Sequence, residues 1–212
     1  MIELNKIYNE DCLEGMKRIP DGSVDCIVCD LPYGVLNKQS EGGGWDSIIP
    51  LHSLWEQYLR ITKPNAAIIL FGQGMFTAKL MMSNENMWRY NITWDKCRKT
   101  GFLNAKKMPL KQTEVISVFY NGQPTYHPQM RKCLPHERNH SRGKQEKEQT
   151  NRCYGNFGKA EDVITDEKYP TDIVVFQRDI YNSFHPTQKP VALIQYLIRT
   201  YSNEGDTILD NC

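Results

Sequence analysis

The fold is decided by one stretch near the start of the chain, VDCIVCDLPYG, which covers Val24–Gly34. Its first six residues are a short, nearly continuous apolar run that follows the turn signal at Pro20–Ser23 and stops at Asp30. Runs of this kind, bounded by turn residues, are typical of strands that are buried in a parallel sheet. We therefore predict a buried strand over 24–29 that ends in a tight turn.

The residues after this strand alternate between helix and strand patterns. Apolar residues at helical spacing predict a helix over 51–62, and Lys63-Pro64-Asn65 ends it. The next predicted elements are a strand at 66–71, a helix at 75–82 and strands at 89–94 and 114–120. Strands that alternate with helices indicate a parallel α/β sheet.

Regular patterns return in the last part of the chain. A strand is predicted at 172–176, a helix at 191–201 with Pro190 in its first turn, and a strand at 206–210. Between 121 and 169 the periodicity disappears and polar residues dominate. We interpret this segment as an insertion that is mobile or is ordered by a partner.

Composition places the chain among ordinary globular proteins. It has 212 residues, of which 40% are hydrophobic and 24% charged, so it can bury a core. No stretch approaches the ~20 apolar residues of a membrane span, and the first residues do not form a signal peptide. Seven cysteines at scattered spacings argue against a secreted disulfide framework. We expect a cytoplasmic protein without a membrane partner.

Charge is distributed unevenly along the chain. The segment 96–152 contains 13 Lys and Arg against 4 Asp and Glu, a net charge of +9, whereas the remainder carries −8. Such an asymmetry predicts a polyanionic partner for the basic segment, although a solvated loop with scattered lysines would look similar.

The residues directly after the first strand could do chemistry. Ligands of open α/β sheets bind at the carboxyl ends of strands, where Asp30 is predicted to lie. Asp30 accepts hydrogen bonds, and Leu31, held extended by Pro32, can aim its carbonyl outward as a second acceptor. Two acceptors that converge suit an NH₂ group, and Tyr33 offers a ring on which a planar base could stack. The alternative is a turn that merely ends a strand.

Asp30-Leu31-Pro32-Tyr33 resembles the catalytic tetrapeptide of amino-group DNA methyltransferases, usually Asp/Asn-Pro-Pro-Tyr. The His185–Pro190 stretch, HPTQKP, resembles the helix start that leads into the cofactor strand of that family, here 206–210. The turn at 9–13 resembles the family's acidic turn near the cofactor adenine. The catalytic motif comes first, which is the order of the beta class, and the arrangement is most similar to phage and prophage adenine methylases.

This resemblance implies a fold and a division into parts. The fold would be a Rossmann-like, S-adenosylmethionine-dependent methyltransferase fold in permuted order. Residues 1–120 would form the catalytic α/β half, 121–170 a target-recognition insertion, and 171–212 the start of the cofactor-binding half.

The resemblance also implies an activity. The chain would be a site-specific enzyme that moves a methyl group from S-adenosylmethionine to N6 of an adenine flipped out of double-stranded DNA. Asp30 and the Leu31 carbonyl would hold the amino group, and Tyr33 would stack on the base. Leu31 departs from the family's commoner proline, but only its backbone carbonyl would be used. Asp at the first position favours adenine, because the cytosine-modifying relatives usually carry Ser there.

The cofactor and DNA contacts follow from the same resemblance. The predicted cofactor-binding residues are Asp11, Asp30, His185, Thr187, Lys189 and Asp210. Of these, Asp210 would bind the methionine ammonium, and Lys189 would lie near the methionine carboxylate. The predicted DNA-binding residues are Lys96, Arg98, Lys99, Lys106, Lys107 and Lys111 in an acid-free loop, and Arg131, Lys132, Arg138 and Arg142 in the insertion.

The end of the sequence sets a further expectation. In the family a glycine-rich loop, a helix and a ribose-binding acid follow the cofactor strand, whereas this sequence stops at Cys212. We therefore expect a C-terminally truncated chain that binds the cofactor weakly or not at all. We also expect unpaired sheet edges, or a partner chain such as a second copy that covers them.

Other interpretations are open. A catalytically incomplete DNA-binding module and an N4-cytosine methyltransferase both fit, and a paired restriction enzyme is neither indicated nor excluded. Motif order argues against protein or RNA methyltransferases with a similar tetrapeptide. Cys26 and Cys29 should face opposite sides of their strand and be core thiols. We predict no metal site, although zinc would tolerate the spacing of Cys133, His136, His140 and Cys153.

Overall fold

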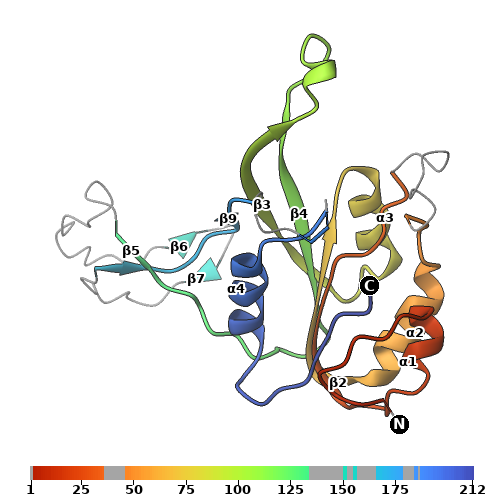
Figure 1. The fold of residues 1–212 in the computed structure, drawn as a ribbon. Helices are drawn as coiled ribbons and strands as arrows, with labels where there is room; N and C mark the ends of the chain where they lie inside the picture. The colour runs from red at the N-terminus through yellow and green to blue at the C-terminus, as the bar shows by residue number, and fades with distance from the viewer. Residues whose placement is uncertain are drawn as a thin grey trace. The chain divides into compact units, whose positions relative to one another are not determined.

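The strand predicted over 24–29 is confirmed as β1 (Val24–Cys29), and it lies inside a six-stranded sheet (Figure 1). The computed structural model describes residues 2–35, 46–133, 150–151, 155–156, 166–178, 184–185 and 187–212. The strand order among these residues is β10-β1-β2-β4-β3-β9. The other strands of this sheet are β2 (Thr62–Gly72), β3 (Trp88–Thr100), β4 (Lys111–Phe119), β9 (Ile173–Val175) and β10 (Ile208–Leu209).

The sheet is mixed, whereas the sequence predicted a parallel one. β1 is parallel to β2 and to β10, and β3 is parallel to β9, but β4 is antiparallel to both of its neighbours, β2 and β3. The reason is the connection between β3 and β4. It contains no helix that could cross over the sheet, only a short 3₁₀ turn η2 (Phe102–Asn104), and such a hairpin joins antiparallel strands.

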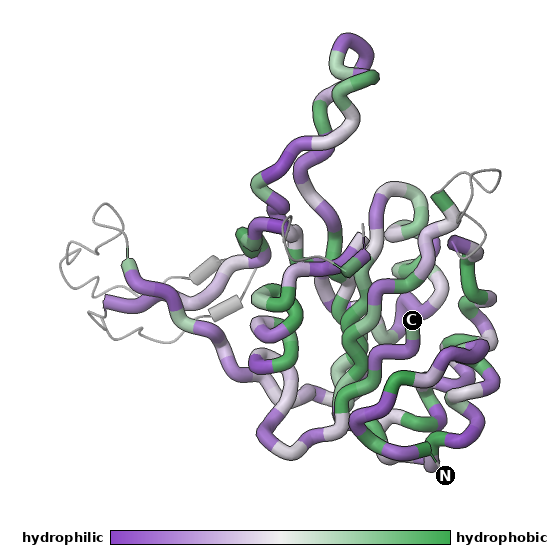
Figure 2. Tube along the Cα trace, viewed as in Figure 1, coloured by the Kyte–Doolittle hydropathy of each residue, from purple (hydrophilic) through white to green (hydrophobic). Residues whose placement is uncertain are grey.

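Helices cover both faces of the sheet. One core cluster joins α1 (Cys12–Met16), α2 (Leu51–Ile61) and α3 (Met75–Ser83) to one face, and a second joins α4 (Val191–Tyr201) to the other. Cys29 belongs to the first cluster and Cys26 to the second, which confirms that these thiols point to opposite faces of β1. In Figure 2 the hydrophobic residues concentrate in the central strands and on the helix faces turned toward them.

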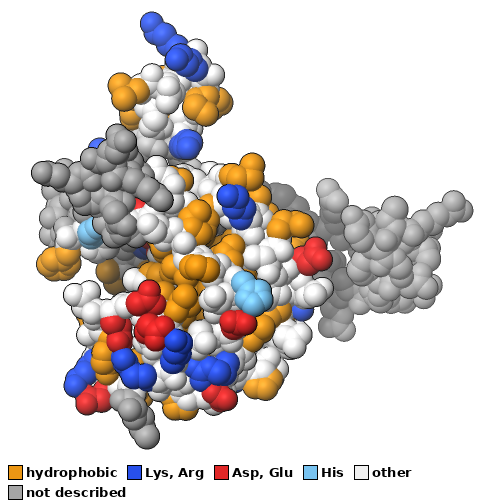
Figure 3. Space-filling view, turned by 90° about the vertical axis from the view of Figure 1, so that its right-hand side faces the viewer, with side chains coloured by type: hydrophobic (Ala, Val, Ile, Leu, Met, Phe, Trp, Pro, Cys, Tyr) orange, Lys and Arg blue, Asp and Glu red, His pale blue; other side chains and the backbone are white. Residues whose placement is uncertain are grey.

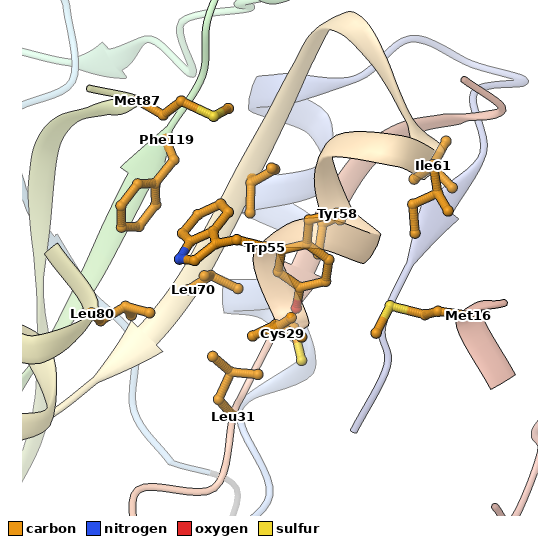
Figure 4. Close-up of a cluster of buried hydrophobic side chains, with 14 of the residues drawn as sticks. Met16, Cys29, Leu31, Trp55, Tyr58, Ile61, Leu70, Leu80, Met87 and Phe119 are labelled. Atoms are coloured by element: carbon orange, nitrogen blue, oxygen red, sulfur yellow. The ribbon is translucent and has the colours of Figure 1, made fainter. Parts of the chain in front are cut away.

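The first cluster shows why α2 forms where it does. Leu54, Trp55, Tyr58 and Ile61 recur at helical spacing and are all buried. Figure 4 shows Trp55 and Tyr58 between Phe119 of β4 and Cys29 of β1. The Tyr58 hydroxyl, too deep to reach solvent, donates to Asn211 Oδ1 at 2.6 Å and so ties α2 to the residues after β10.

Several boundaries differ from the sequence prediction. β2 begins at Thr62, four residues earlier than expected, because Val24 of β1 pairs with Thr62. α4 begins at Val191, with Pro190 as its N-cap in an extended conformation instead of in the first turn. α1 was not predicted; the Asp11 carboxylate caps it by accepting from the N–H groups of Leu13 and Glu14.

The loop predicted around 96–111 is shorter than expected, because strands extend into both of its ends. β3 continues to Thr100 and β4 begins at Lys111, where these two residues pair. Gly101 turns the chain with a φ of 89°, in the left-handed region that glycine adopts without strain. We call residues 97–111 the hairpin arm; Figure 1 shows it extending beyond the other strands of the sheet.

A separate compact unit is formed by Pro128–Pro170, and the rest of the chain forms the other. In its described part, β5 (Arg131–Lys132) pairs with β8 (Glu167–Lys168), and β6 (Thr150–Asn151) pairs with β7 (Gly155–Asn156). In the described ranges no helix is long and apolar enough to cross a membrane.

Candidate active site

Two acidic residues follow neighbouring parallel strands at one edge of the sheet. Ile27 of β1 pairs with Leu209 of β10, so Asp30 and Asp210 both lie just past the carboxyl ends of these strands. Loss of surrounding water raises the pKa of Asp210, and the nearby Asp30 charge acts in the same direction. This edge is where open α/β sheets bind ligands.

Asp30 is held by two donors. The Tyr33 hydroxyl donates to Asp30 Oδ1 at 2.7 Å, and the Lys189 ammonium donates to Asp30 Oδ2 at 2.6 Å. Burial and the Asp30 carboxylate raise the pKa of Tyr33 well above its usual range, so the phenol keeps its proton and stays a donor. The carboxylate is therefore fixed in direction and acts as an acceptor.

The rest of the tetrapeptide shapes the space next to Asp30. The Leu31 side chain is buried in the core, and no described residue donates a hydrogen bond to its carbonyl. The Tyr33 ring stacks on Phe76 with centroids 5.1 Å apart. Gly34 then turns the chain with a φ of 69°, and a Cβ there would lie 2.8 Å from Ile48.

A pocket of about 200 Å³ opens at this place. Its lining includes the tetrapeptide Asp30–Tyr33, the turn residues Thr187–Lys189, and Trp94 of β3. A second pocket of about 400 Å³ runs along the hairpin arm, and Gln73, Glu114 and Arg178 line both pockets. The catalytic candidates thus face a cavity that continues toward the arm.

The structure places two charged residues, Glu114 and Lys96, at the site, where the sequence analysis did not expect them. Glu114 was not selected; its Oε1 accepts from the Lys96 ammonium at 3.1 Å. Lys96 was predicted to contact DNA, but it is 3% exposed and bound to Glu114, so this expectation does not hold. A usable signal was present, because Glu114 is the only acid between 96 and 120.

The predicted cofactor residues do not all lie in one place. Lys189 and Thr187 line the pocket with Asp30. His185 bonds Thr187 Oγ1 at 2.8 Å within its own turn, which shapes the approach to α4. Asp11 caps α1, so one of its carboxylate oxygens already accepts two backbone N–H groups.

The predicted DNA contacts lie on two parts of the chain. The exposed members on the hairpin arm are Arg98, Lys99, Lys106, Lys107 and Lys111, and those in the second unit are Arg131 and Lys132. Figure 3 shows basic and hydrophobic side chains together on the projecting arm. Arg138 and Arg142 lie outside the described residues.

Of the candidate zinc ligands, Cys133 lies within the described residues, and His136, His140 and Cys153 lie outside them. Among the residues that the structure describes, no group of His, Cys, Asp and Glu could hold a metal ion.

Two of the known proteins that resemble this chain match it over nearly its whole length. It is 27% identical over 237 residues to the type II methyltransferase M.HinfI of Haemophilus influenzae, covering 98% of this chain and 58% of that protein. It is 26% identical over 223 residues to the DNA adenine methyltransferase YhdJ of Escherichia coli (strain K12), covering 98% of this chain and 71% of that protein. A 74-residue match to M.BamHI of Bacillus amyloliquefaciens is 30% identical and covers 32% of this chain and 18% of that protein.

Solved structures support the same fold. The M1.HpyAVI–SAM complex superposes with a TM-score of 0.58 at 17% identity, over 97% of this chain and 80% of that one. The cytosine-N4-specific PvuII DNA methyltransferase gives a TM-score of 0.62 at 13% identity, over 96% of this chain and 72% of that one. These likenesses establish the Rossmann-like methyltransferase fold.

The decisive match is to a family. The sequence model described as DNA methylase, that of the N6/N4 methyltransferases, matches residues 24–211, from the first residue of β1 to just past β10. This range holds Asp30-Leu31-Pro32-Tyr33, Lys189 and Asp210, the residues that meet at one edge of the sheet. The chain therefore belongs to the N6/N4 DNA methylase family.

Proposed function

We propose that the chain is a site-specific DNA methyltransferase that methylates N6 of adenine in double-stranded DNA. One observation carries this proposal: the Asp30 carboxylate, fixed by Tyr33 and Lys189, lines a pocket together with Leu31, whose carbonyl has no donor among the described residues. Two acceptors of this kind suit an exocyclic amino group.

The cofactor fits the residues present. Asp30 and Asp210, two acids at one edge of the sheet, suit a cationic ligand group, and the hydroxyl of Thr187 in the pocket lining suits a carboxylate. These are the charges that the methionine part of S-adenosylmethionine carries. When bound, S-adenosylmethionine supplies an electrophilic methyl group.

The chain's own residues would act by positioning. Asp30 and the Leu31 carbonyl accept the two amino hydrogens. These hydrogen bonds reduce the conjugation of the nitrogen lone pair with the base ring and direct the lone pair toward the methyl group that is transferred. Asp30 is also the nearest acceptor for the proton that the methylated nitrogen releases. No covalent bond between protein and base is needed.

The DNA contacts follow from charge and from the depth of the site. The amino group of a paired base is buried in the duplex, so the base must leave the stack to reach the pocket. The basic hairpin arm would hold the flanking phosphates, and the Pro128–Pro170 unit would recognise the target sequence.

The test is to incubate the protein with unmethylated DNA and S-adenosylmethionine and to measure methylated nucleosides by mass spectrometry. We expect N6-methyladenine that disappears in Asp30→Ala. N4-methylcytosine in its place would change only the target base. No methylated product, with DNA binding intact, would favour a DNA-binding module.

A further inference from the structure

Four charged side chains from distant segments form a line of alternating charge behind the pocket. Lys96 of β3 pairs with Glu114 of β4, and Lys189 lies between Glu114 and Asp30. The side chains of Lys96, Glu114 and Lys189 are 4%, 15% and 11% exposed, so water screens them weakly. Each of these charges therefore needs a partner.

The pairing is incomplete at one atom. Glu114 Oε1 accepts from Lys96, whereas Glu114 Oε2 is buried and has no hydrogen-bond partner among the described residues. The Lys189 ammonium stands 3.5 Å from this oxygen but donates to Asp30 Oδ2 at 2.6 Å. One ammonium thus lies between two carboxylates and bonds only one of them.

The ammonium occupies the place that a target amino group needs. Tyr33 takes Asp30 Oδ1 and Lys189 takes Oδ2. Under the proposed function, on which this inference rests, the exocyclic amino group of the base must donate to the same carboxylate. Each carboxylate oxygen has two lone pairs, so the ammonium does not fill Oδ2 completely. An ammonium bound to Oδ2 nevertheless weakens this oxygen as an acceptor for the base, so the two N–H donors compete for it.

Lys189 can change partner without a large movement. Its Nζ lies 5.6 Å from the Tyr33 ring centroid and 5.2 Å from that of Phe71, and cation–π attraction keeps it beside these rings. A shift of Nζ by about 0.5–1 Å brings Glu114 Oε2 within hydrogen-bond distance.

We propose that Lys189 is a positioning residue with two alternative partners. Without a bound base, its ammonium fixes the orientation of the Asp30 carboxylate. When the amino group of the target base arrives, the ammonium moves to Glu114 Oε2, which Lys96 holds in place. The buried ammonium then keeps a counter-charge in both states, and Asp30 becomes an acceptor for the base.

The kinetic test is a double-mutant cycle with unmethylated plasmid DNA as the substrate. Glu114→Gln keeps the shape but removes the charge that receives the ammonium, so kcat/KM should fall about tenfold. In a Lys189→Met background no ammonium has to be displaced, and Glu114→Gln should change kcat/KM less than about twofold. The proposal is overturned if Glu114→Gln lowers kcat/KM by the same factor in both backgrounds, or if it does not change kcat/KM in the wild-type background.

A folding control accompanies the cycle. Glu114→Gln leaves Lys96 buried without a counter-charge, so melting temperatures are compared for all variants. If Glu114→Gln unfolds, the pair Lys96→Met/Glu114→Gln removes both charges and carries the same test in its place.

A second readout does not depend on turnover. The ammonium resonance of Lys189 is followed in protein labelled with [¹⁵N]lysine and is assigned by its loss in Lys189→Met. Adenosine or cytidine, which carry the amino group, should move it, whereas inosine, which lacks that group, should not. Glu114→Gln should abolish the movement.

The outcomes separate this inference from the proposed function. Methyl transfer without an amino-dependent movement keeps the function and overturns the inference. The movement without methyl transfer supports the inference and overturns the function. A resonance that responds to S-adenosylmethionine alone and ignores nucleosides overturns the inference and assigns Lys189 to the cofactor.

Discussion

At the scale of residues, the site depends on how Asp30 is held. The carboxylate receives one donor from three residues away in the chain and another from 159 residues away. The near donor, Tyr33, also lines the pocket with its ring. One residue therefore orients the Asp30 carboxylate with its hydroxyl and offers a ring on which the base is proposed to stack. Its hydroxyl and its ring can be tested separately.

Tyr33→Phe removes the hydroxyl and keeps the ring. We expect kcat to fall about tenfold, because a hydrogen bond to a charged group contributes about 1.5 kcal/mol, while the affinity for DNA stays unchanged. The measurement is steady-state methylation of plasmid DNA. Tyr33→Leu, which also removes the ring, should raise KM as well; an unchanged kcat in Tyr33→Phe would remove the hydroxyl from the mechanism.

Candidate residues could be selected from the sequence where the information is local. Asp30 to Tyr33 could be selected because a strand, a proline and an aromatic residue follow one another in the chain. The partner of Lys189 could not be predicted, because no local sequence pattern distinguishes a lysine that binds a cofactor from one that binds Asp30. The roles assigned to the site residues remain predictions that the experiments above test.

At the scale of elements, the hairpin arm separates charges that the sequence groups together. Lys106 and Lys107 lie exposed on the arm beyond η2, whereas Lys96 lies in the buried part of β3. The alternation along β3 decides this, since Ile92, Trp94 and Lys96 share its buried side. The aliphatic stem of a lysine suits that side when an acid such as Glu114 receives the ammonium.

The arm gives a salt-dependence prediction. Lys106→Gln/Lys107→Gln should weaken binding to all duplexes and lower the slope of log affinity against log salt by about 2, since each phosphate contact contributes about 0.9. Fluorescence titrations at several salt concentrations measure this slope. Lys17→Gln, in an exposed ion pair with Glu14 on α1, is the matched control and should leave the slope unchanged.

We expect the opposite result for Lys96→Gln. It should lower the melting temperature, because Glu114 loses its buried partner, and leave the salt slope unchanged. A reduced slope in Lys96→Gln would instead return this residue to the DNA contacts.

At the scale of the whole molecule, one carboxylate ties three strands together. Asp25 of β1 accepts from the Thr207 N–H before β10 at 3.0 Å and from the Lys63 ammonium of β2 at 2.6 Å. Burial alone would raise the pKa of Asp25, but these two donors outweigh it and lower the pKa. The group therefore binds a proton more weakly in the folded state than in the unfolded chain.

This pKa shift has a defined sign. A depressed folded pKa contributes stability that is present above the unfolded value, about 3.9, and is lost as pH falls through the folded value. Wild-type protein should therefore lose more stability than Asp25→Asn between pH 5 and pH 3 (about the range of a carboxyl group). Urea unfolding at each pH measures the difference, and parallel curves for the two proteins would contradict it.

The sequence was sufficient to predict the fold class, but not the direction of every strand. Alternating strands and helices indicated an α/β sheet, and the periodic segments gave β1, α2, α3 and α4 to within a few residues. The reversed β4 was missed because strand direction depends on how a connection crosses the sheet, which local periodicity does not report. The grouping of the Pro128–Pro170 residues also depends on contacts that no local pattern specifies.

The pairing of β1 with β10 has a consequence for synthesis. β1 meets β2 soon after both leave the ribosome, but its other edge stays open until Ile208 and Leu209 have been made. Contacts this distant in sequence form slowly, and an open apolar strand edge invites aggregation in the meantime. A nascent chain would expose this edge of β1 until β10 has been made, so chaperones that shield strand edges should raise the yield of folded protein.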